Sequence, residues 1–169
     1  TRKKNAVDST YTINGSHIMS VITEKDLAVH VSTKLSWNNH IDTIISKANM
    51  MLRMIKRTCR DECDEKTLMV LYKSLVRSQL EYASHVWTPH TKEKTTAIER
   101  VQRRATKFIL KNVLSYSERL ATLKLLPLEY KGEILDLCFF FKCLKDHTDF
   151  DVLAYVNFKI PKYNIRIKE

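Results

Sequence analysis

Five basic side chains recur at helical spacing in the middle of the chain: Arg100, Arg103, Arg104, Lys107 and Lys111. At 100° per residue they centre on a different face from the apolar residues of the same stretch, which are Ile98, Val101, Ala105, Phe108 and Ile109. Cationic side chains on one exposed face can contact phosphates without reading bases, and such affinity falls steeply with salt. The pattern predicts a basic ridge that binds nucleic acid; the alternative is a solvated helix face.

The carboxylates of the chain do not form a recognisable catalytic set. Template-directed polymerisation uses two Mg²⁺ ions held by clustered carboxylates, because the attacking and the leaving oxygen each need a metal. The sequence has no adjacent pair of aspartates, and the nearest approach is Asp149-Phe150-Asp151, in a weakly patterned tail. We therefore expect no catalytic residue, no metal site and no polymerase activity in this chain by itself.

Other patterns that could support chemistry are also incomplete. Cys59 and Cys63 lack a second pair at zinc spacing, and Cys138 and Cys143 fall in an apolar stretch where free cysteines act as small core residues. The two glycines are far apart, so there is no glycine-rich phosphate loop. No Ser/His/Asp set can be assigned, which leaves binding as the predicted kind of function.

Composition favours a basic helical protein. The chain has 169 residues with a net charge of +10, and only two glycines and three prolines, which disfavours sandwiches and barrels. The positive charge favours a polyanionic partner, of which nucleic acid is the commonest. No signal peptide and no apolar run of membrane-spanning length is present, so we expect an intracellular protein of the nucleus or cytoplasm, not secreted and without a membrane partner.

The first region, residues 1–35, has the pattern of short strands. Asn14-Gly15 is the residue pair that a type I′ turn favours, because both positions take positive φ. Leu27, Val29 and Val31 alternate with polar or small residues and predict a further strand. Three short strands are therefore expected, and these would be poorly stable without a larger sheet to pack on.

The second region, residues 36–112, has the pattern of a helical bundle. Ser36 is the predicted N-cap of a first helix, whose apolar stripe includes Ile41, Ile44, Ile45, Ala48, Leu52 and Ile55. Asp64 is the predicted cap of a second helix that continues to about Pro89, with a stripe of Leu68, Leu71, Leu75 and Tyr82. The third helix, from about Thr91 to Leu110, carries the basic ridge.

Two further regions follow the predicted bundle. Residues 113–147 should contain a short helix from Ser115 to about Leu123 and a longer one with Pro127 at its first position. The longer helix is apolar nearly all round, so we expect it to be heavily buried. Residues 148–169 have a weak pattern and are expected to be a poorly ordered tail. The predicted fold class is mainly α, with a short N-terminal β-hairpin region followed by the bundle.

The order of several segments resembles the region after the catalytic palm in reverse transcriptases of non-LTR retrotransposons, the jockey-like and CR1-like LINE elements. Residues 11–57, with Lys25-Asp26-Leu27 on a strand and Leu35-Ser36-Trp37 before a helix, are similar to the segment just after the palm. The segments that look like later thumb elements are 74–87, 99–107 and 119–128. One departure is Ala28, where the family usually has glycine; alanine disfavours positive φ.

The resemblance implies that this region clamps a template–primer duplex, either RNA–DNA or DNA, with the bundle as a thumb. It places Asn14, Gly15, Ser16 and His17 in an element like a primer grip, although such a hairpin tip can equally be a bare turn. It also implies that residues 1–35 comprise the end of the palm, with its last strand at residues 1–5, and the hairpin region. The catalytic part of the palm, with its Mg²⁺, is then expected upstream, and the rest of the polyprotein is a partner. The alternative is a helical protein–protein interaction module, or a decayed or domesticated fragment of such an element.

Overall fold

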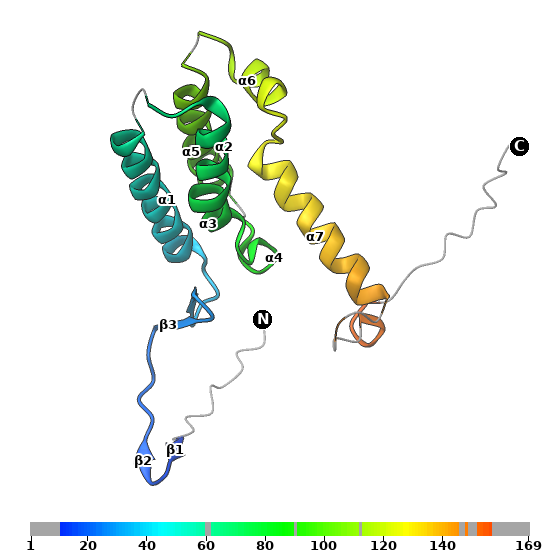
Figure 1. The fold of residues 1–169 in the computed structure, drawn as a ribbon. Coiled ribbons are helices and arrows are strands. Elements are labelled where there is room, and N and C mark those ends of the chain that lie inside the picture. The colour runs from blue at the N-terminus through cyan, green and yellow to red at the C-terminus, as the bar shows by residue number, and fades with distance from the viewer. Residues whose placement is uncertain are drawn as a thin grey trace, which may run out of the picture.

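The structure is a computed structural model that describes residues 11–59, 62–89, 91–111, 113–145, 148 and 152–156. Helices make up most of this described part, and its strands form two small antiparallel pairs near the N-terminus. Figure 1 shows the strand pairs below one end of a bundle of helices, with α1 at one edge and α7 at the other. The predicted fold class, mainly α after a short β-hairpin region, is confirmed at this level.

The first strand pair is the hairpin that Asn14-Gly15 predicted. Strand β1 (Thr12–Ile13) pairs with β2 (Ser16–His17), and the two turn residues have φ of 49° and 79°. Both values lie in the left-handed region, which Asn and Gly adopt more readily than other residues. The whole hairpin is exposed to solvent, so its turn chemistry rather than burial specifies its shape.

The second strand pair differs from its prediction. Strand β3 (Thr23–Asp26) pairs with β4 (Val29–Ser32), and the intervening turn is made by Leu27 and Ala28, with φ of 41° and 68°. The placement of Leu27 on a strand was wrong, because the turn uses the two residues that would have continued the alternation. Val29 is buried where β4 contacts α1, and this contact joins the hairpin to the bundle.

Helix α1 (Asn38–Thr58) buries the predicted stripe, with Ile45 only partly covered. Its predicted cap is wrong: Trp37 occupies the N-cap position without a side-chain cap bond. The Ser36 amide instead donates to the Ser32 hydroxyl over 2.9 Å, and that hydroxyl donates back to the Ser36 carbonyl. Ser36 is thereby tied to the end of β4, and the helix begins two residues later.

The second predicted helix is divided into four segments. These are α2 (Glu65–Leu71), the π-helix η1 (Tyr72–Arg77), α3 (Ser78–Glu81) and α4 (Ser84–Trp87). Asp64 is the cap as predicted, accepting the Thr67 amide over 3.2 Å. Between α3 and α4 the backbone is extended at Tyr82 and left-handed at Ala83, so the helix does not continue unbroken to Pro89.

The buried stripe of this second helix also differs from the prediction. The buried apolar residues are Leu68, Tyr72, Val76 and Leu80. Leu71 and Leu75 are only partly covered, and Tyr82 is 53% exposed. Four-residue steps drift by about 40° in an α-helix, but the wider turn of the π-helix takes up that drift. The prediction assumed α-helical spacing throughout and therefore selected the wrong residues.

The last helices begin close to where the sequence placed them. Helix α5 (Lys92–Leu110) is capped by Thr91, and α6 (Tyr116–Leu123) has a full capping box between Ser115 and Glu118. Helix α7 (Leu128–Leu144) has Pro127 at its N-cap rather than at its first position. Of the predicted tail, only Thr148 and residues 152–156 are described, with a 3-10 turn at Val152–Ala154; the prediction for the remainder lies outside the described residues.

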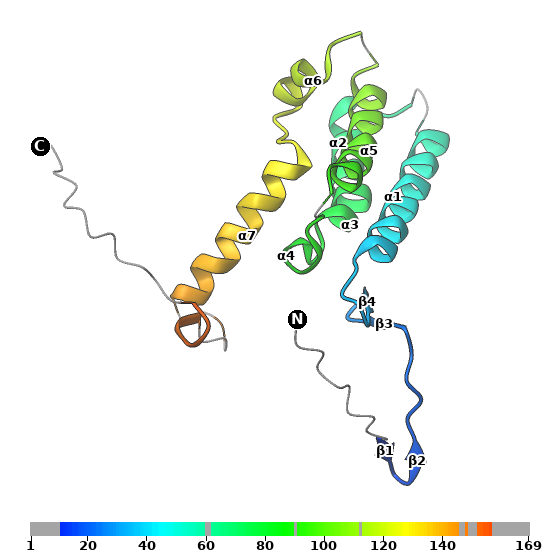
Figure 2. The same ribbon diagram turned by 180° about the vertical axis from the view of Figure 1, so that it is seen from behind.

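Helix α7 is not buried as predicted. It contacts α4 and α5, and Figures 1 and 2 both place it at the opposite edge of the bundle from α1. Leu128 and Cys143 are its buried residues, whereas Leu137 is 68% exposed and Phe141 57% exposed. A helix that is apolar on all sides is expected to pack against other elements on all sides. The described residues pack against only one side of α7.

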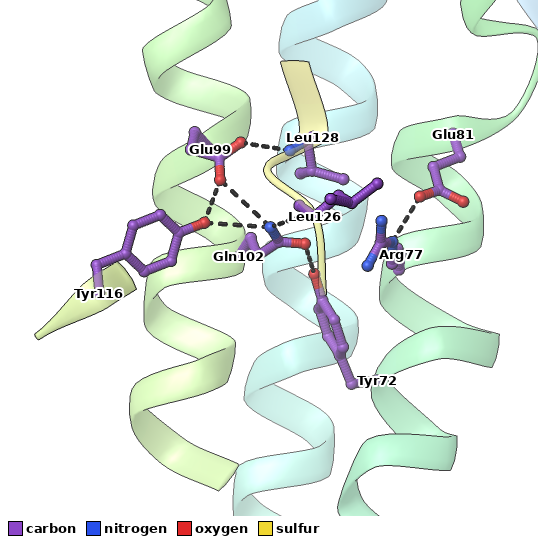
Figure 3. A network of polar contacts seen from close by, with 8 residues as sticks. All are labelled: Tyr72, Arg77, Glu81, Glu99, Gln102, Tyr116, Leu126 and Leu128. Atoms are coloured by element: carbon purple, nitrogen blue, oxygen red, sulfur yellow. Dashed lines mark hydrogen bonds and ion pairs between the residues drawn. The ribbon is translucent and has the colours of Figure 1, made fainter. Parts of the chain in front are cut away.

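A buried polar network fixes the rotation of α5 about its axis (Figure 3). The Tyr72 hydroxyl donates to Gln102 Oε1 over 2.8 Å, and Gln102 Nε2 donates to the Leu126 carbonyl over 3.0 Å. Glu99 accepts the Tyr116 hydroxyl and, over 2.9 Å, the Leu128 amide at the start of α7. The network joins η1, α5, α6 and α7 and holds Gln102 on the buried side of α5.

Candidate nucleic-acid interface

The basic side chains of α5 lie opposite its buried face. Arg100, Arg103, Arg104 and Lys107 are exposed, and Lys111 is exposed at the end of the helix, where its φ is 48°. The buried face comprises Ile98, Val101, Gln102, Ala105, Thr106 and Ile109. The predicted separation of faces is therefore present, although Phe108, counted among the apolar face, is only partly buried.

Arg104 belongs to a groove between α5 and α1. Its Nη1 donates to Asn49 Oδ1 of α1 over 3.1 Å. The groove has a volume of about 250 Å³ and is lined by Ser46, Asn49, Leu52, Arg53, Lys56 and Arg104. Three of the six lining residues are cationic and none is acidic. Two helices thus contribute positive charge to one concave surface.

No carboxylate among the described residues neutralises the cations of this groove. In the part of the chain that the structure describes, none of Arg53, Lys56 and Arg104 forms an ion pair with a carboxylate. Partial burial, and then the charge of Arg104, lower the pKa of Lys56 below its usual value. Lys56 Nζ also lies 5.4 Å from the centre of the Phe108 ring. An anion bound between these groups would relieve their mutual repulsion.

Arg103 lies on the other flank of α5. Its guanidinium carbon is 4.6 Å from the centre of the Tyr116 ring of α6. The buried Arg119 guanidinium is 5.6 Å from the same ring centre and donates to Thr106 Oγ1 over 3.2 Å. Adjacent residues on a helix point about 100° apart, so Arg103 and Arg104 diverge. The predicted ridge is therefore broad, with one edge against α6 and the other in the groove with α1.

The predicted primer-grip-like residues do not join this surface. Asn14, Gly15, Ser16 and His17 are exposed on the β1–β2 hairpin. Figures 1 and 2 both show that hairpin well away from α5, with β3 and β4 between it and the bundle. The structure brings the five α5 residues together on one surface and leaves the hairpin residues as a separate group.

Sequence reasoning missed the contribution of α1 to the groove. Asn49, Arg53 and Lys56 recur at i, i+4 and i+7 beside Leu52 of the buried stripe. That spacing signals a polar strip on the flank of α1. The sequence does not reveal which helix faces that strip, since this depends on how α1 packs against α5.

The thiols and carboxylates of the described residues offer no competing catalytic centre. No three or more His, Cys, Asp or Glu side chains in the described ranges gather to hold a metal. Asp149 and Asp151 lie outside those ranges. A hydrogen bond with Cys59 raises the pKa of the Cys63 thiol, which disfavours the reactive thiolate. No helix among the described residues is long and apolar enough to cross a bilayer.

Comparison of this chain with protein-family models, curated proteins and solved structures finds no match. The groove and the sequence pattern are therefore the features that bear on function.

Proposed function

We propose that this chain binds the phosphate backbone of a nucleic-acid duplex, as the region after the palm of a non-LTR retrotransposon reverse transcriptase. In this proposal α5 and α1 form a thumb-like clamp on the template–primer duplex, and the palm elsewhere in the polyprotein carries the Mg²⁺ and the chemistry. The clamp itself holds and orients the duplex and takes no part in bond formation.

One observation carries the proposal: Arg53, Lys56 and Arg104 meet in a groove without a carboxylate. A solvated helix face would present its cations singly, whereas here cations from two helices converge, and burial followed by the charge of Arg104 lowers the pKa of Lys56. Backbone phosphates are the anions that such convergence suits. Arg100, Arg103 and Lys107 extend the same charge along the exposed face of α5.

Binding to a labelled RNA–DNA hybrid across a salt series tests the proposal. We expect the logarithm of the affinity to fall linearly with the logarithm of salt concentration, with a slope of about 0.9 per phosphate neutralised. Changing Arg53, Lys56, Arg104 and Lys107 to Glu should abolish binding at moderate salt. The variant should remain helical, because these side chains lie outside the buried stripes.

A matched variant separates the groove from general charge. Changing Lys66, Lys92, Lys124 and Lys142 to Glu also alters the net charge by eight units, from +10 to +2, at exposed positions outside the groove. Its binding should stay within a few-fold of the parent. Equal losses in both variants would mean non-specific attraction, and a parent chain that is inert at low salt would refute the clamp.

A protein–protein interaction module is the second candidate, favoured by the exposed apolar side chains of α7. It predicts that reversing the groove charges changes solubility without removing any binding partner. The two candidates use different surfaces, so the groove variant and a variant of α7 distinguish them.

A further inference from the structure

The exposed side of α7 has the spacing of a coiled-coil seam. Five apolar residues follow one another at intervals of four, three, four and three: Tyr130, Ile134, Leu137, Phe141 and Leu144. This is the alternation of a and d positions in a heptad, with Ile134 and Phe141 at a and the other three at d. We call these five residues the α7 seam. The pattern indicates a helix as the occupant.

The seam faces away from the bundle. Its residues span about 80° of the helix surface, and the buried Leu128 and Cys143 lie on the opposite side. The exposed fractions along the seam are 57%, 40%, 68%, 57% and 40%. All five residues that keep the heptad are thus exposed, while Phe139 and Phe140, at 42% and 39%, are exposed apolar residues of α7 outside the seam.

We propose that the α7 seam pairs with the same seam of a second copy of this chain, in parallel orientation. Ile at a with Leu at d is the combination that favours two-stranded parallel coiled coils. In parallel pairing each seam residue meets its own copy, so Ile134, Leu137 and Leu144 form matched apolar layers. Tyr130 forms an aromatic layer before Ile134, and Phe141 forms one between Leu137 and Leu144.

Charge on the flanks of the seam selects the orientation. Lys131 and Lys145 both occupy e positions, and an antiparallel pair would bring Lys131 of one copy toward Lys145 of the other. In a parallel pair, Glu133 at g faces Cys138 and Phe140 at g faces Lys145, so no like charges are opposed. Lys145 already holds its Nζ 5.8 Å from the centre of the Phe141 ring, which places a cation beside an aromatic seam residue.

The available area predicts a weak dimer. A fully buried aromatic side chain removes 150–250 Å² from water, so Tyr130 and Phe141 each offer on the order of 100 Å² at 57% exposure. The whole seam offers on the order of 500 Å² per copy, below the roughly 800 Å² per partner of a standard interface. The helix provides two heptads, so we expect a dissociation constant on the order of 10 µM.

Sedimentation velocity of the purified chain across a concentration series tests this pairing. We expect a monomer at low micromolar concentration and a dimer at about 100 µM. Leu137→Glu should shift the dissociation constant upward at least tenfold. Val70→Glu, at a 65% exposed apolar residue of α2, should leave it unchanged. A parent chain that stays monomeric, or a Leu137→Glu variant that dimerises equally well, would overturn the proposal.

Cross-linking tests the orientation without relying on a destabilised variant. In a Cys138→Ser background, Leu137→Cys should form a 137–137′ disulfide on oxidation, because a d residue meets its own copy only in parallel pairing. Glu129→Cys, on an outer position of the same helix, should not cross-link. Absence of the 137–137′ bond in a dimeric sample would exclude the parallel seam. Monomeric chain that binds lipid vesicles through α7 would replace the proposal with a membrane-surface role.

Discussion

The buried amide of Gln102 offers the sharpest test of how the bundle is held together. Gln102 is fully buried, accepts a hydrogen bond from the Tyr72 hydroxyl and donates to the Leu126 carbonyl, Tyr116 and Glu99. Gln102→Leu keeps a side chain of similar volume but removes the amide. Tyr72 as a residue is 1% exposed, so its hydroxyl then loses its partner without gaining access to water.

The expected loss follows from the cost of an unpaired buried group. Leaving one buried polar group unsatisfied costs about 1–3 kcal/mol, and the partly accessible Leu126 carbonyl adds a smaller amount. We expect Gln102→Leu to lower the free energy of unfolding by about 2–4 kcal/mol. Tyr72→Phe should cost about 1–3 kcal/mol, because it leaves Gln102 Oε1 without a donor. Both losses are within the stability of a typical domain, so the variants should still fold.

A double-mutant cycle distinguishes this account from simple loss of packing. In the chain with both substitutions neither orphaned partner remains, so its loss should be smaller than the sum of the single losses by about 1–3 kcal/mol. Urea unfolding followed by circular dichroism measures all four members of the cycle. Gln79→Leu is the control: among the described residues Gln79 of α3 donates to the carbonyl of Leu75, four residues earlier in η1, and its loss should stay near 0.5 kcal/mol. Additivity within about 0.5 kcal/mol would refute the reasoning.

Three further predictions concern the hairpin and the helix caps. Ala28→Gly should stabilise the β3–β4 hairpin by about 0.5–1 kcal/mol, because Ala28 has a φ of 68°, which glycine adopts more readily. As a control, Ala121→Gly at an exposed position of α6 should destabilise that helix by a similar amount. Amide exchange measures both effects. Burial, then the charges of His30 and Lys47, lower the pKa of His40, whose Nδ1 accepts the His30 amide over 3.3 Å. The unfolded chain binds a proton at His40 more readily than the folded chain does. The contribution of His40 to the free energy of unfolding should therefore be full above pH 6.5 and be lost as pH falls through its folded pKa. Amide exchange at His30 measures this, and unchanged protection across that range would contradict the prediction. Hydrogen bonds from the Ser115 hydroxyl, and then from its amide, lower the pKa of Glu118 in the capping box. Glu118→Gln should therefore flatten the loss of melting temperature as pH falls below about 4.5, and an unchanged pH dependence below about 4.5 would argue against a role for this carboxylate.

Local patterns in the sequence predicted the local structure well. The Asn14-Gly15 turn, the buried stripes of α1 and α5, and the Asp64 cap all follow from residue type and spacing, and all are present. Each depends on interactions within a few residues of the chain, or on burial of one helix face. The identity of these elements as a polymerase thumb stays a prediction.

Features that depend on how elements meet could not be predicted. The groove needs α1 and α5 side by side, and nothing in the spacing of Arg53 or Lys56 specifies Arg104 as a neighbour. Ser36 caps no helix because Ser32, four residues earlier, engages it. The sequence correctly identified α7 as apolar. Composition alone does not show whether its apolar side chains are buried by the same molecule or by another.

The π-helix η1 makes the number of residues in this segment as important as their kind. Leu68, Tyr72, Val76 and Leu80 share one buried face only because the wider turn absorbs the drift of successive four-residue steps. Inserting a single polar residue beside the exposed Ser74 would leave a sequence with good helical propensity, yet it would rotate everything after it by about 100°. Leu80 and Trp87 would then turn out of the core. An insertion of one codon in this segment should therefore be as damaging as a polar residue in the core, with helical content kept and cooperative unfolding lost.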